Sequence, residues 1–144
     1  MSKAKISEYL EELKNDPNNV ILLNALGNFY RYNCDFDKAE EYYLKGFNID
    51  SNDLDILFNL GNLYYNQAIK SSNKKECILA KKYYLKYLSL EPDDICTLNN
   101  LGYLYYIQKE YYKAKEYYTK AFEINPYDNK VLNNMQKLYL EYGV

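Results

Sequence analysis

The sequence predicts an all-α protein built from stacked antiparallel helix pairs, with about eight helices in all. Three observations support this prediction: a marker pattern that repeats along the chain, apolar residues at helical spacing inside each unit, and helix-breaking residues between units. The chain has 144 residues, of which 48% are hydrophobic. That length and composition suit one compact domain with a buried core.

The repeating pattern is a Leu-Gly pair followed by an alanine and, four residues after the alanine, a tyrosine. The markers are Gly27, Gly61 and Gly102, then Ala39, Ala80 and Ala114, then Tyr43, Tyr84 and Tyr118. Successive glycines are 34 and 41 residues apart, whereas successive alanines and tyrosines are 41 and 34 apart. A single insertion of 7 residues between Gly61 and Ala80 accounts for both series. The period is therefore 34 residues with one interruption.

Each unit is predicted to contain two helices that pack closely. In the first helix of the first unit, Leu23, Leu26 and Tyr30 share one face at spacings of three and four residues. Glycine and alanine at the marker positions have almost no side chain, so the two helices can approach each other closely. The tyrosines at the packing positions are predicted to lie in the core, namely Tyr9, Tyr30, Tyr43, Tyr64, Tyr84, Tyr105, Tyr118 and Tyr139.

Helix-breaking residues divide the chain into three full units and two half units. The breaks fall at Pro17, Ser51, Pro92 and Pro126. The predicted organisation is a capping helix over 1–17, repeats over 20–53, 54–94 and 95–128, and a second capping helix over 129–144. The last helix has the pattern of a first helix in which Gln136 replaces the glycine. Stacked repeats need such polar caps at their ends.

The insertion lies near 67–76, in the second repeat. Seven residues amount to about two helical turns, and the polar run from Ser71 to Lys74 predicts a turn in their middle. We therefore expect both helices of this repeat to be about one turn longer. Ile69, Cys77 and Ile78 are expected to pack on one another there. A longer loop between unchanged helices is the alternative.

The pattern Leu-x-x-Leu-Gly-x-x-Tyr, then Ala-x-x-x-Tyr, then Pro, resembles the tetratricopeptide repeat over essentially the whole chain. The second unit departs most, through its insertion and through Tyr87, where the family usually has alanine. The resemblance implies an α-solenoid that winds as a right-handed superhelix, with the first helices lining a concave groove. In this family the groove commonly holds a peptide of a partner protein.

Composition and motifs argue against catalytic activity and against a bound metal or cofactor. The chain has no histidine, which removes Ser-His-Asp and Cys-His nucleophile arrangements and the common zinc sites. Its three cysteines form no Cys-x-x-Cys pair, and no glycine-rich phosphate loop is present. We therefore predict a protein that is not an enzyme, with no catalytic residue, metal or cofactor.

Charge and hydropathy limit the partners and the location. The net charge is -2, and lysine and glutamate are interleaved, so no basic face is available for nucleic acid. No run reaches the roughly 18 apolar residues that a membrane helix needs. The first 16 residues lack the apolar stretch of a signal peptide. A cytoplasmic protein with a protein or peptide partner is expected.

Residues of the first helices that are not used for packing are expected to line the groove. Nine of 24 such positions are asparagine. Asparagine carries a donor and an acceptor on one planar group, so it can pair with both N–H and C=O of a peptide. The predicted peptide-binding residues are Asn24, Asn28, Tyr32, Asn59, Asn62, Tyr65, Asn99, Asn100, Tyr103, Tyr106 and Asn134.

Two subtypes of the family bear on these residues. Asn59, Asn100 and Asn134 recur at one place in successive units, which resembles the asparagine ladder of O-linked N-acetylglucosamine transferases. The alternative is that these asparagines are ordinary solvated residues. Repeats that clamp the acidic tail of heat-shock chaperones use two lysines and an arginine on this face. Here those positions hold Asn24, Cys96 and Asn100, which argues against that ligand.

The leading hypothesis is an adaptor that holds a peptide of another protein. One alternative is a structural module that stacks on copies of itself, as a homo-oligomer. Another resembles the three-repeat chaperones of secretion systems, which hold unfolded segments in the same groove. Growth in particle mass with concentration distinguishes the stacking module from the other two.

Overall fold

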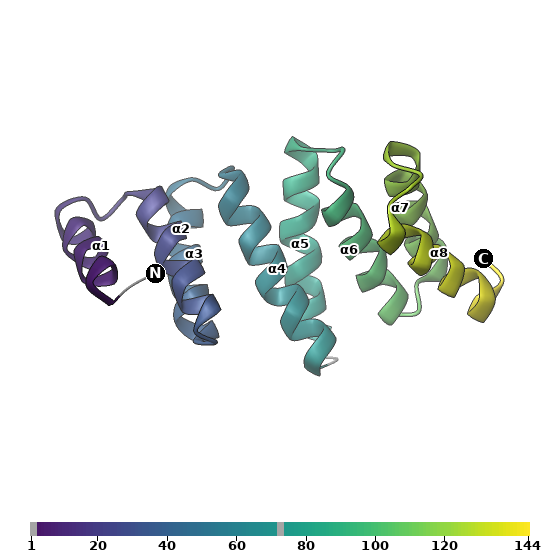
Figure 1. Cartoon of the computed structure of the whole chain (residues 1–144), viewed down its shortest axis with the longest axis horizontal. Helices are drawn as coiled ribbons and strands as arrows, with labels where there is room; N and C mark the ends of the chain where they lie inside the picture. The colour runs from purple at the N-terminus through teal and green to yellow at the C-terminus, as the bar shows by residue number, and fades with distance from the viewer. Residues whose placement is uncertain (1–2, 72–73) are drawn as a thin grey trace.

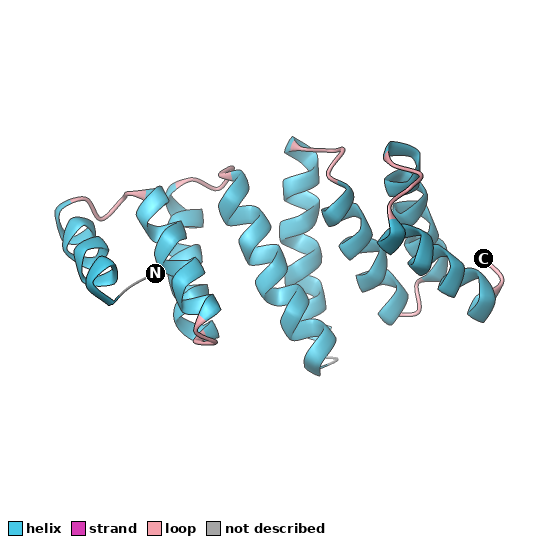
Figure 2. Ribbon diagram, in the orientation of Figure 1, coloured by secondary structure: helices cyan, strands magenta, loops and turns pink. Residues whose placement is uncertain are grey.

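The computed structural model describes residues 3–71 and 74–144, which form eight α-helices and no strand (Figure 2). The helices are α1 (Lys3–Asn15), α2 (Val20–Tyr32), α3 (Phe36–Ile49), α4 (Leu54–Ser71), α5 (Lys74–Leu90), α6 (Ile95–Ile107), α7 (Tyr111–Ile124) and α8 (Asn129–Tyr142). They follow one another in chain order along the long axis of the molecule (Figure 1). The predicted all-α architecture and the number of helices are confirmed.

The helices form two layers. Helix α2 packs on α3, α4 on α5 and α6 on α7, and these are the most extensive contacts in the fold. The first helices also touch one another, α2 with α4, α4 with α6 and α6 with α8. Among the described residues, the backbones of α3, α5 and α7 lie farther apart, and α3 meets α5 through long side chains such as Phe47 and Tyr83, whose ring centroids are 5.3 Å apart. The first helices therefore lie on the inner, concave side of the stack and the second helices on the outer side.

The glycine and tyrosine markers of each unit meet in space. The pairs are Gly27 with Tyr43, Gly61 with Tyr84, and Gly102 with Tyr118. A Cβ atom added at any of these glycines would lie 2.4–2.6 Å from a ring carbon of its tyrosine, closer than atoms can pack. The absence of a side chain is thus what lets the ring lie between the two helices.

A second tyrosine contact repeats in every full unit. Three parallel ring pairs join the first helix to the second: Tyr30 with Tyr42, Tyr64 with Tyr83 and Tyr105 with Tyr117, with centroids 5.3–5.7 Å apart. The sequence markers did not include Tyr42, Tyr83 or Tyr117. Stacked rings add to the stabilisation that burial of their area provides.

The predicted tyrosine core is mostly confirmed, with one error. Tyr43, Tyr64, Tyr84, Tyr105 and Tyr118 are buried, whereas Tyr9 and Tyr30 are partly buried. Tyr139 was predicted to be core but is 66% exposed. It occupies the position of Tyr30, Tyr64 and Tyr105, but in the described chain no second helix packs over that face of α8.

Helices α4 and α5 extend beyond their neighbours at one edge of the molecule (Figure 1). They have 18 and 17 residues, against 13 and 14 in the other two pairs. The expectation of two longer helices is confirmed. The expected packing is not, because Ile69 and Ile78 are 43% and 53% exposed, whereas Ala68 and Cys77 are buried. Ser72 and Asn73, in the predicted turn, lie outside the described residues.

The two shorter pairs, α2–α3 and α6–α7, close with the same kind of tight turn. Cys34 and Lys109 adopt the left-handed backbone conformation, with φ of 60° and 63°. Asp35 and Glu110 then donate their N–H groups to carbonyls five residues earlier, at 2.9 Å. This arrangement satisfies carbonyl groups that the end of a helix would otherwise leave unpaired.

Tyr87 is larger than the residues that the other units have at this register position, and its ring packs against Phe58, with centroids 5.6 Å apart. In the register it stands where Gly46 and Ala121 stand, and Gly46 faces Ile56, to whose Cδ1 an added Cβ would approach within 2.7 Å. The residue equivalent to Ile56 in the next unit is Thr97, which is fully buried. Its hydroxyl has no hydrogen-bond partner among the described residues. The unusual tyrosine thus changes local packing and leaves the fold intact.

Candidate functional site

The residues predicted to bind a peptide lie mostly on the concave side, where the first helices meet one another. Asn24, Asn28, Asn59, Asn62, Tyr65, Asn100, Tyr103, Tyr106 and Asn134 are partly exposed, and Asn99 is buried. Tyr32 is 77% exposed at the end of α2. It lies beside Arg31, whose guanidinium is 4.8 Å from the ring centroid, and it makes no ring contact with the other predicted tyrosines within the described chain.

Two of the three proposed ladder asparagines bind the neighbouring repeat. The amide nitrogen of Asn59 on α4 donates to Oδ1 of Asn24 on α2, at 2.8 Å. Asn134 on α8 donates in the same way to Asn99 on α6, also at 2.8 Å. These two bonds link adjacent first helices and therefore stabilise the stacking of units. Each amide keeps a second N–H group for another partner.

Asn100, the middle residue of the ladder, is arranged differently. In the register the residue across from it on α4 is Phe58, which has no amide to pair with. The Asn100 amide nitrogen instead lies 3.2 Å from the Tyr84 hydroxyl and 3.9 Å from Cys96 Sγ. The three ladder asparagines are therefore not equivalent. The α4–α6 junction lacks the pair of hydrogen-bonded asparagines that joins α2 to α4 and α6 to α8.

Asn28 and Asn62 hold the marker tyrosines of their own units. Their Oδ1 atoms accept hydrogen bonds from Tyr43 and Tyr84, at 2.8 and 2.7 Å. In the third unit the equivalent residue is Tyr103, which offers no amide oxygen. The hydroxyl of Tyr118 therefore has no hydrogen-bond partner among the described residues.

The phenol of Tyr118 has a raised pKa. The residue is 1% exposed, and burial is the largest cause of the rise in the pKa of its phenol. Electrostatic interactions with Tyr65, Tyr103 and Tyr106 are smaller causes of the same rise.

A continuous row of aromatic rings follows the groove from α4 to α8. We call Tyr65, Tyr103, Tyr106, Tyr111 and Tyr142 the tyrosine lane. The ring centroids are 6.2 Å apart for Tyr65 and Tyr103, 5.8 Å for Tyr103 and Tyr106, and 5.9 Å for Tyr106 and Tyr142. Tyr111 and Tyr142 stack at 3.7 Å. The sequence analysis missed these last two, which come from the start of α7 and the end of α8.

Three hydroxyl groups of the lane, those of Tyr65, Tyr106 and Tyr111, have raised pKa values. Burial raises the pKa of Tyr65 to about 12. A hydrogen bond with Tyr142 raises the pKa of Tyr111 to about 12, with a smaller contribution from burial. Burial and a hydrogen bond to Glu141 raise the pKa of Tyr106. These three tyrosines therefore stay uncharged at neutral pH and present apolar rings edged with hydroxyl groups.

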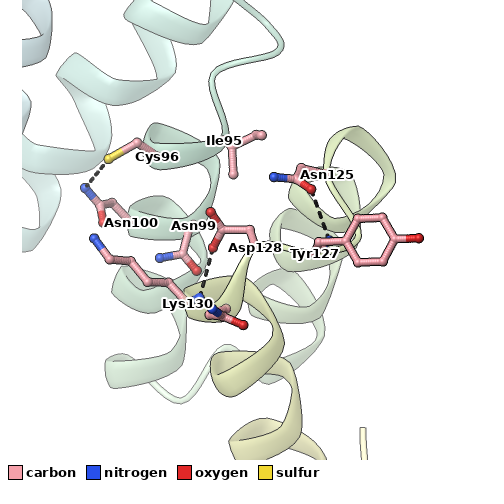
Figure 3. A pocket seen from close by; sticks show the side chains of 9 residues that line it. Ile95, Cys96, Asn99, Asn100, Asn125, Tyr127, Asp128 and Lys130 are labelled. Atoms are coloured by element: carbon pink, nitrogen blue, oxygen red, sulfur yellow. Dashed lines mark hydrogen bonds between the residues drawn. The ribbon is translucent and has the colours of Figure 1, made fainter.

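A cavity of about 530 Å³ opens at the start of α6 and α8 (Figure 3). It brings together Asn99 and Asn100 from the predicted groove, and Cys96, Tyr127 and Lys130 also line it. Figure 3 shows Asn100 and Lys130 extending to the same side of the cavity, while the Tyr127 ring points away. This volume is within the range of small-ligand pockets.

The described residues were also compared with the requirements of a metal site and of a membrane-spanning helix. The described residues contain no group of three or more His, Cys, Asp or Glu side chains placed to bind a metal ion. None of the described helices has the length and the apolar content needed to span a membrane. Asp94, one of the carboxylates at helix starts, caps α6 by accepting the Thr97 N–H at 2.7 Å.

Comparison with known proteins identifies the repeats. Family models described as tetratricopeptide repeat match residues 21–53 and 95–128. The chain is a tetratricopeptide repeat protein, a class of protein-interaction modules that are typically not enzymes. No curated protein sequence matches it.

Solved structures share the fold. MamA is 25% identical with a TM-score of 0.83, over 96% of this chain and 77% of MamA. A tetratricopeptide repeat protein from Parabacteroides merdae is 21% identical with a TM-score of 0.84, over 96% of this chain and 52% of that one. The first such domain of Spaghetti (RPAP3), bound to the HSP90 peptide SRMEEVD, is 18% identical with a TM-score of 0.75, over 87% and 94%.

Proposed function

We propose that this chain holds a peptide segment of a partner protein in the concave groove formed by α2, α4, α6 and α8, and that it performs no catalysis. The observation that carries the proposal is the surface at the α4–α6 junction. There, Tyr65 and Tyr103 of the tyrosine lane are partly exposed, with ring centroids 6.2 Å apart. The Tyr65 ring also lies 6.2 Å from the ring of Tyr84, whose hydroxyl accepts a hydrogen bond from Asn100. Apolar area together with unpaired donors is what a peptide backbone and its side chains require.

The asparagines contribute to this groove in two ways. The amide pairs Asn59–Asn24 and Asn134–Asn99 set the distance between neighbouring first helices. Asn100 lacks such a pair, and it lines the cavity of Figure 3. Of the three ladder residues, Asn100 is therefore the one that we assign to direct contact with a ligand. The Spaghetti domain, which has the same fold, is seen with a peptide bound, which supports this general mode.

A peptide library tests the proposal even while the partner is unidentified. A display library of random dodecapeptides is selected on the whole chain and on a double variant, Asn100→Ala with Tyr103→Ala. Tyr112→Ala is the matched control, because Tyr112 is 79% exposed on α7 and outside the tyrosine lane. We expect peptides that bind the parent and the control but not the double variant. Failure to enrich any peptide, or equal binding to the double variant, would falsify the proposal.

Self-association is a second candidate function, favoured by the outer face of α8. Leu132 and Tyr139 are exposed there, beside a cavity of about 410 Å³ that Phe122 and Met135 also line. In the three full units the equivalent face of the first helix is covered by the second helix. Light scattering over a concentration series tests this candidate. Growth in mass that Tyr139→Ser abolishes supports it, and a constant monomer mass argues against it.

A further inference from the structure

We infer that the outer face of α5 is a second docking surface, which binds an acidic segment of a partner protein. This face lies on the opposite side of the stack from the groove, so the inference goes beyond the proposed function and does not depend on it. Three features support it: a surplus of positive charge that α3 and α7 lack, two lysines without carboxylate partners, and the narrow width of the charged surface.

Helix α5 carries far more positive charge than the other two second helices of the full units. Its 17 residues include five lysines and one glutamate, with no aspartate. Helix α3 has two lysines and three acidic residues, and α7 has three lysines and two glutamates. The interleaving of lysine and glutamate that the sequence analysis expected therefore does not hold in α5.

A pair of lysines replaces an ion pair at one register position of α5. In α3 and α7 a glutamate forms an ion pair with the lysine four residues later. These pairs are Glu41 with Lys45 at 2.6 Å and Glu116 with Lys120 at 2.7 Å. The corresponding residues of α5 are Lys82 and Lys86. Like charges at this spacing destabilise a helix, whereas Glu followed by Lys stabilises it, so the stability of α5 does not explain the two lysines.

Neither Lys82 nor Lys86 forms an ion pair with a carboxylate in the described part of the chain. Both ammonium groups lie beside the ring of Phe47 on α3, with Nζ atoms 6.0 and 5.1 Å from its centroid. Lys45 and Lys120 also lie over aromatic rings and are ion-paired as well. A ring contact therefore does not take the place of a carboxylate in this layer, and two positive charges remain for an outside anion.

Apolar side chains are exposed along the same face of α5. Ile78 and Leu85 are 53% and 42% exposed. They lie four residues before and three residues after Lys82, which places all three on one side of the helix. Leu85 also lines a cavity of about 520 Å³ to which α5 and α7 both contribute. We call Ile78, Lys82, Leu85 and Lys86 the basic stripe. Its ligand needs carboxylates for the lysines and apolar side chains for Ile78 and Leu85, and an acidic protein segment has both.

The width of the basic stripe favours a single peptide segment over a broad anionic surface. Helices α3 and α7 lie on either side of α5 along the stack (Figure 1). At the register position of Lys82 they have Glu41 and Glu116, whose side chains are both 56% exposed. A nucleic-acid duplex or an anionic bilayer on the stripe would bring phosphates toward these glutamates, and their like charges would repel. A segment one chain wide can follow α5 without meeting them.

Charge reversal at Lys82 tests the inference without disturbing the fold. Lys82→Glu gives α5 the Glu-to-Lys spacing of α3 and α7, so its melting temperature should equal or exceed that of the parent. The probe is a fluorescein-labelled tetradecapeptide of glutamate and leucine, with the leucines at helical spacing. A second peptide has glutamine in place of every glutamate. Fluorescence anisotropy measures the binding of each to the whole chain.

We expect the glutamate peptide to bind the parent with a dissociation constant at least about tenfold lower than that of the glutamine peptide. Added salt should reduce this difference, because the attraction is between exposed charges. Lys82→Glu should weaken binding of the glutamate peptide by at least about tenfold. Lys115→Glu makes the same change in net charge at an exposed position of α7 and is the matched control. It should change the dissociation constant by less than about twofold.

Four results would overturn the inference. The first is no measurable binding of the glutamate peptide, and the second is binding that Lys82→Glu leaves unchanged. The third is tighter binding of a DNA duplex or of phosphatidylserine vesicles, which would make a broad anionic surface the ligand. The fourth is loss of the glutamate peptide in the Asn100→Ala, Tyr103→Ala double variant, which would place that peptide in the groove and leave the proposed function standing. Library-selected groove peptides should bind Lys82→Glu as tightly as the parent, so the two surfaces can fail separately.

Discussion

The repeats over 20–53 and 95–128 have the same framework and different groove surfaces. In both, a marker tyrosine packs on a glycine, and a second tyrosine pair stacks between the helices. On the groove side, Asn28 accepts a hydrogen bond from Tyr43, whereas its counterpart Tyr103 leaves Tyr118 unpaired. One substitution at one register position thus turns an internal hydrogen bond into a free donor and adds an aromatic ring to the surface.

The comparison distinguishes residues that stabilise the solenoid from residues that are available to bind a ligand. Residues at the interface of the two helices repeat because the interface repeats. Residues on the groove differ from unit to unit, and these differences are concentrated at the α4–α6 junction and toward α8.

Alkaline pH is expected to unfold the whole stack. Burial raises the pKa of Tyr65 to about 12 from an ordinary value of 10.0, and burial also raises the pKa of Tyr43, Tyr84 and Tyr118. Because the folded pKa lies above the unfolded one, this contribution to stability is complete below pH 10 and is lost as pH rises toward about 12. Circular dichroism should lose helix in the step in which tyrosinate absorbance rises. If the tyrosines ionise fully while the helices stay intact, the buried tyrosines do not stabilise the stack.

Close packing at the glycines gives the next largest effect. Gly61→Leu should lower the free energy of unfolding by about 1–3 kcal/mol or more, because the added side chain must displace the Tyr84 ring. Gln136→Leu is the matched change at the same register position of α8, where no second helix packs among the described residues, and it should cost much less. Urea denaturation measures both. Similar losses at the two sites would mean that the repeat register is wrong.

The two marker tyrosines should respond differently to loss of a hydroxyl. Tyr43→Phe breaks the bond to Asn28 and should lower the free energy of unfolding by about 0.5–1.5 kcal/mol. Tyr118→Phe removes a hydroxyl that has no partner within the described chain, so stability should change by less than about 0.5 kcal/mol. Thermal melts of the two variants give the comparison. A larger loss for Tyr118→Phe would show that its hydroxyl has a structural partner.

A peptide with an acidic C-terminus should bind very weakly. The positions at which the chaperone-binding subtype places its cations hold Asn24, Cys96 and Asn100. Without these cations, an acidic tail should bind with a dissociation constant above about 100 μM. Isothermal titration calorimetry with a peptide ending in four acidic residues checks this. Tight binding that weakens with salt would show that another cation, such as Lys130 beside Asn100, takes the role of the clamp.

Much of the packing inside each helix pair was predictable from the sequence because it depends on contacts within one unit. A tyrosine sixteen residues after Gly27 or Gly102 meets that glycine in every such helix pair, so the sequence spacing alone identifies the contact. The longer α4 and α5 were predictable for the same reason, since an insertion inside a helix pair lengthens both helices. Tyr139 was wrongly placed in the core because its burial depends on a second helix, not on its own spacing.

The groove was less predictable because its contacts join different units. Whether Asn59 faces a ligand or binds Asn24 depends on the distance between α2 and α4, which no spacing within a unit defines. The ends of α7 and α8 bring Tyr111 and Tyr142 together for the same reason. Sequence therefore indicated which residue types line the groove, and the structure showed which of them keep free hydrogen-bonding groups.

Nuclear magnetic resonance of the labelled chain with a library-selected peptide tests most directly whether the concave groove is the binding surface. At 17.2 kDa the chain is well suited to amide chemical-shift mapping. The largest shifts are expected on the facing sides of α4, α6 and α8, including the side-chain amide of Asn100, with little change around Tyr112 on α7. If the largest shifts fall on α3, α5 and α7, or on the outer face of α8 around Tyr139, the groove is not the site.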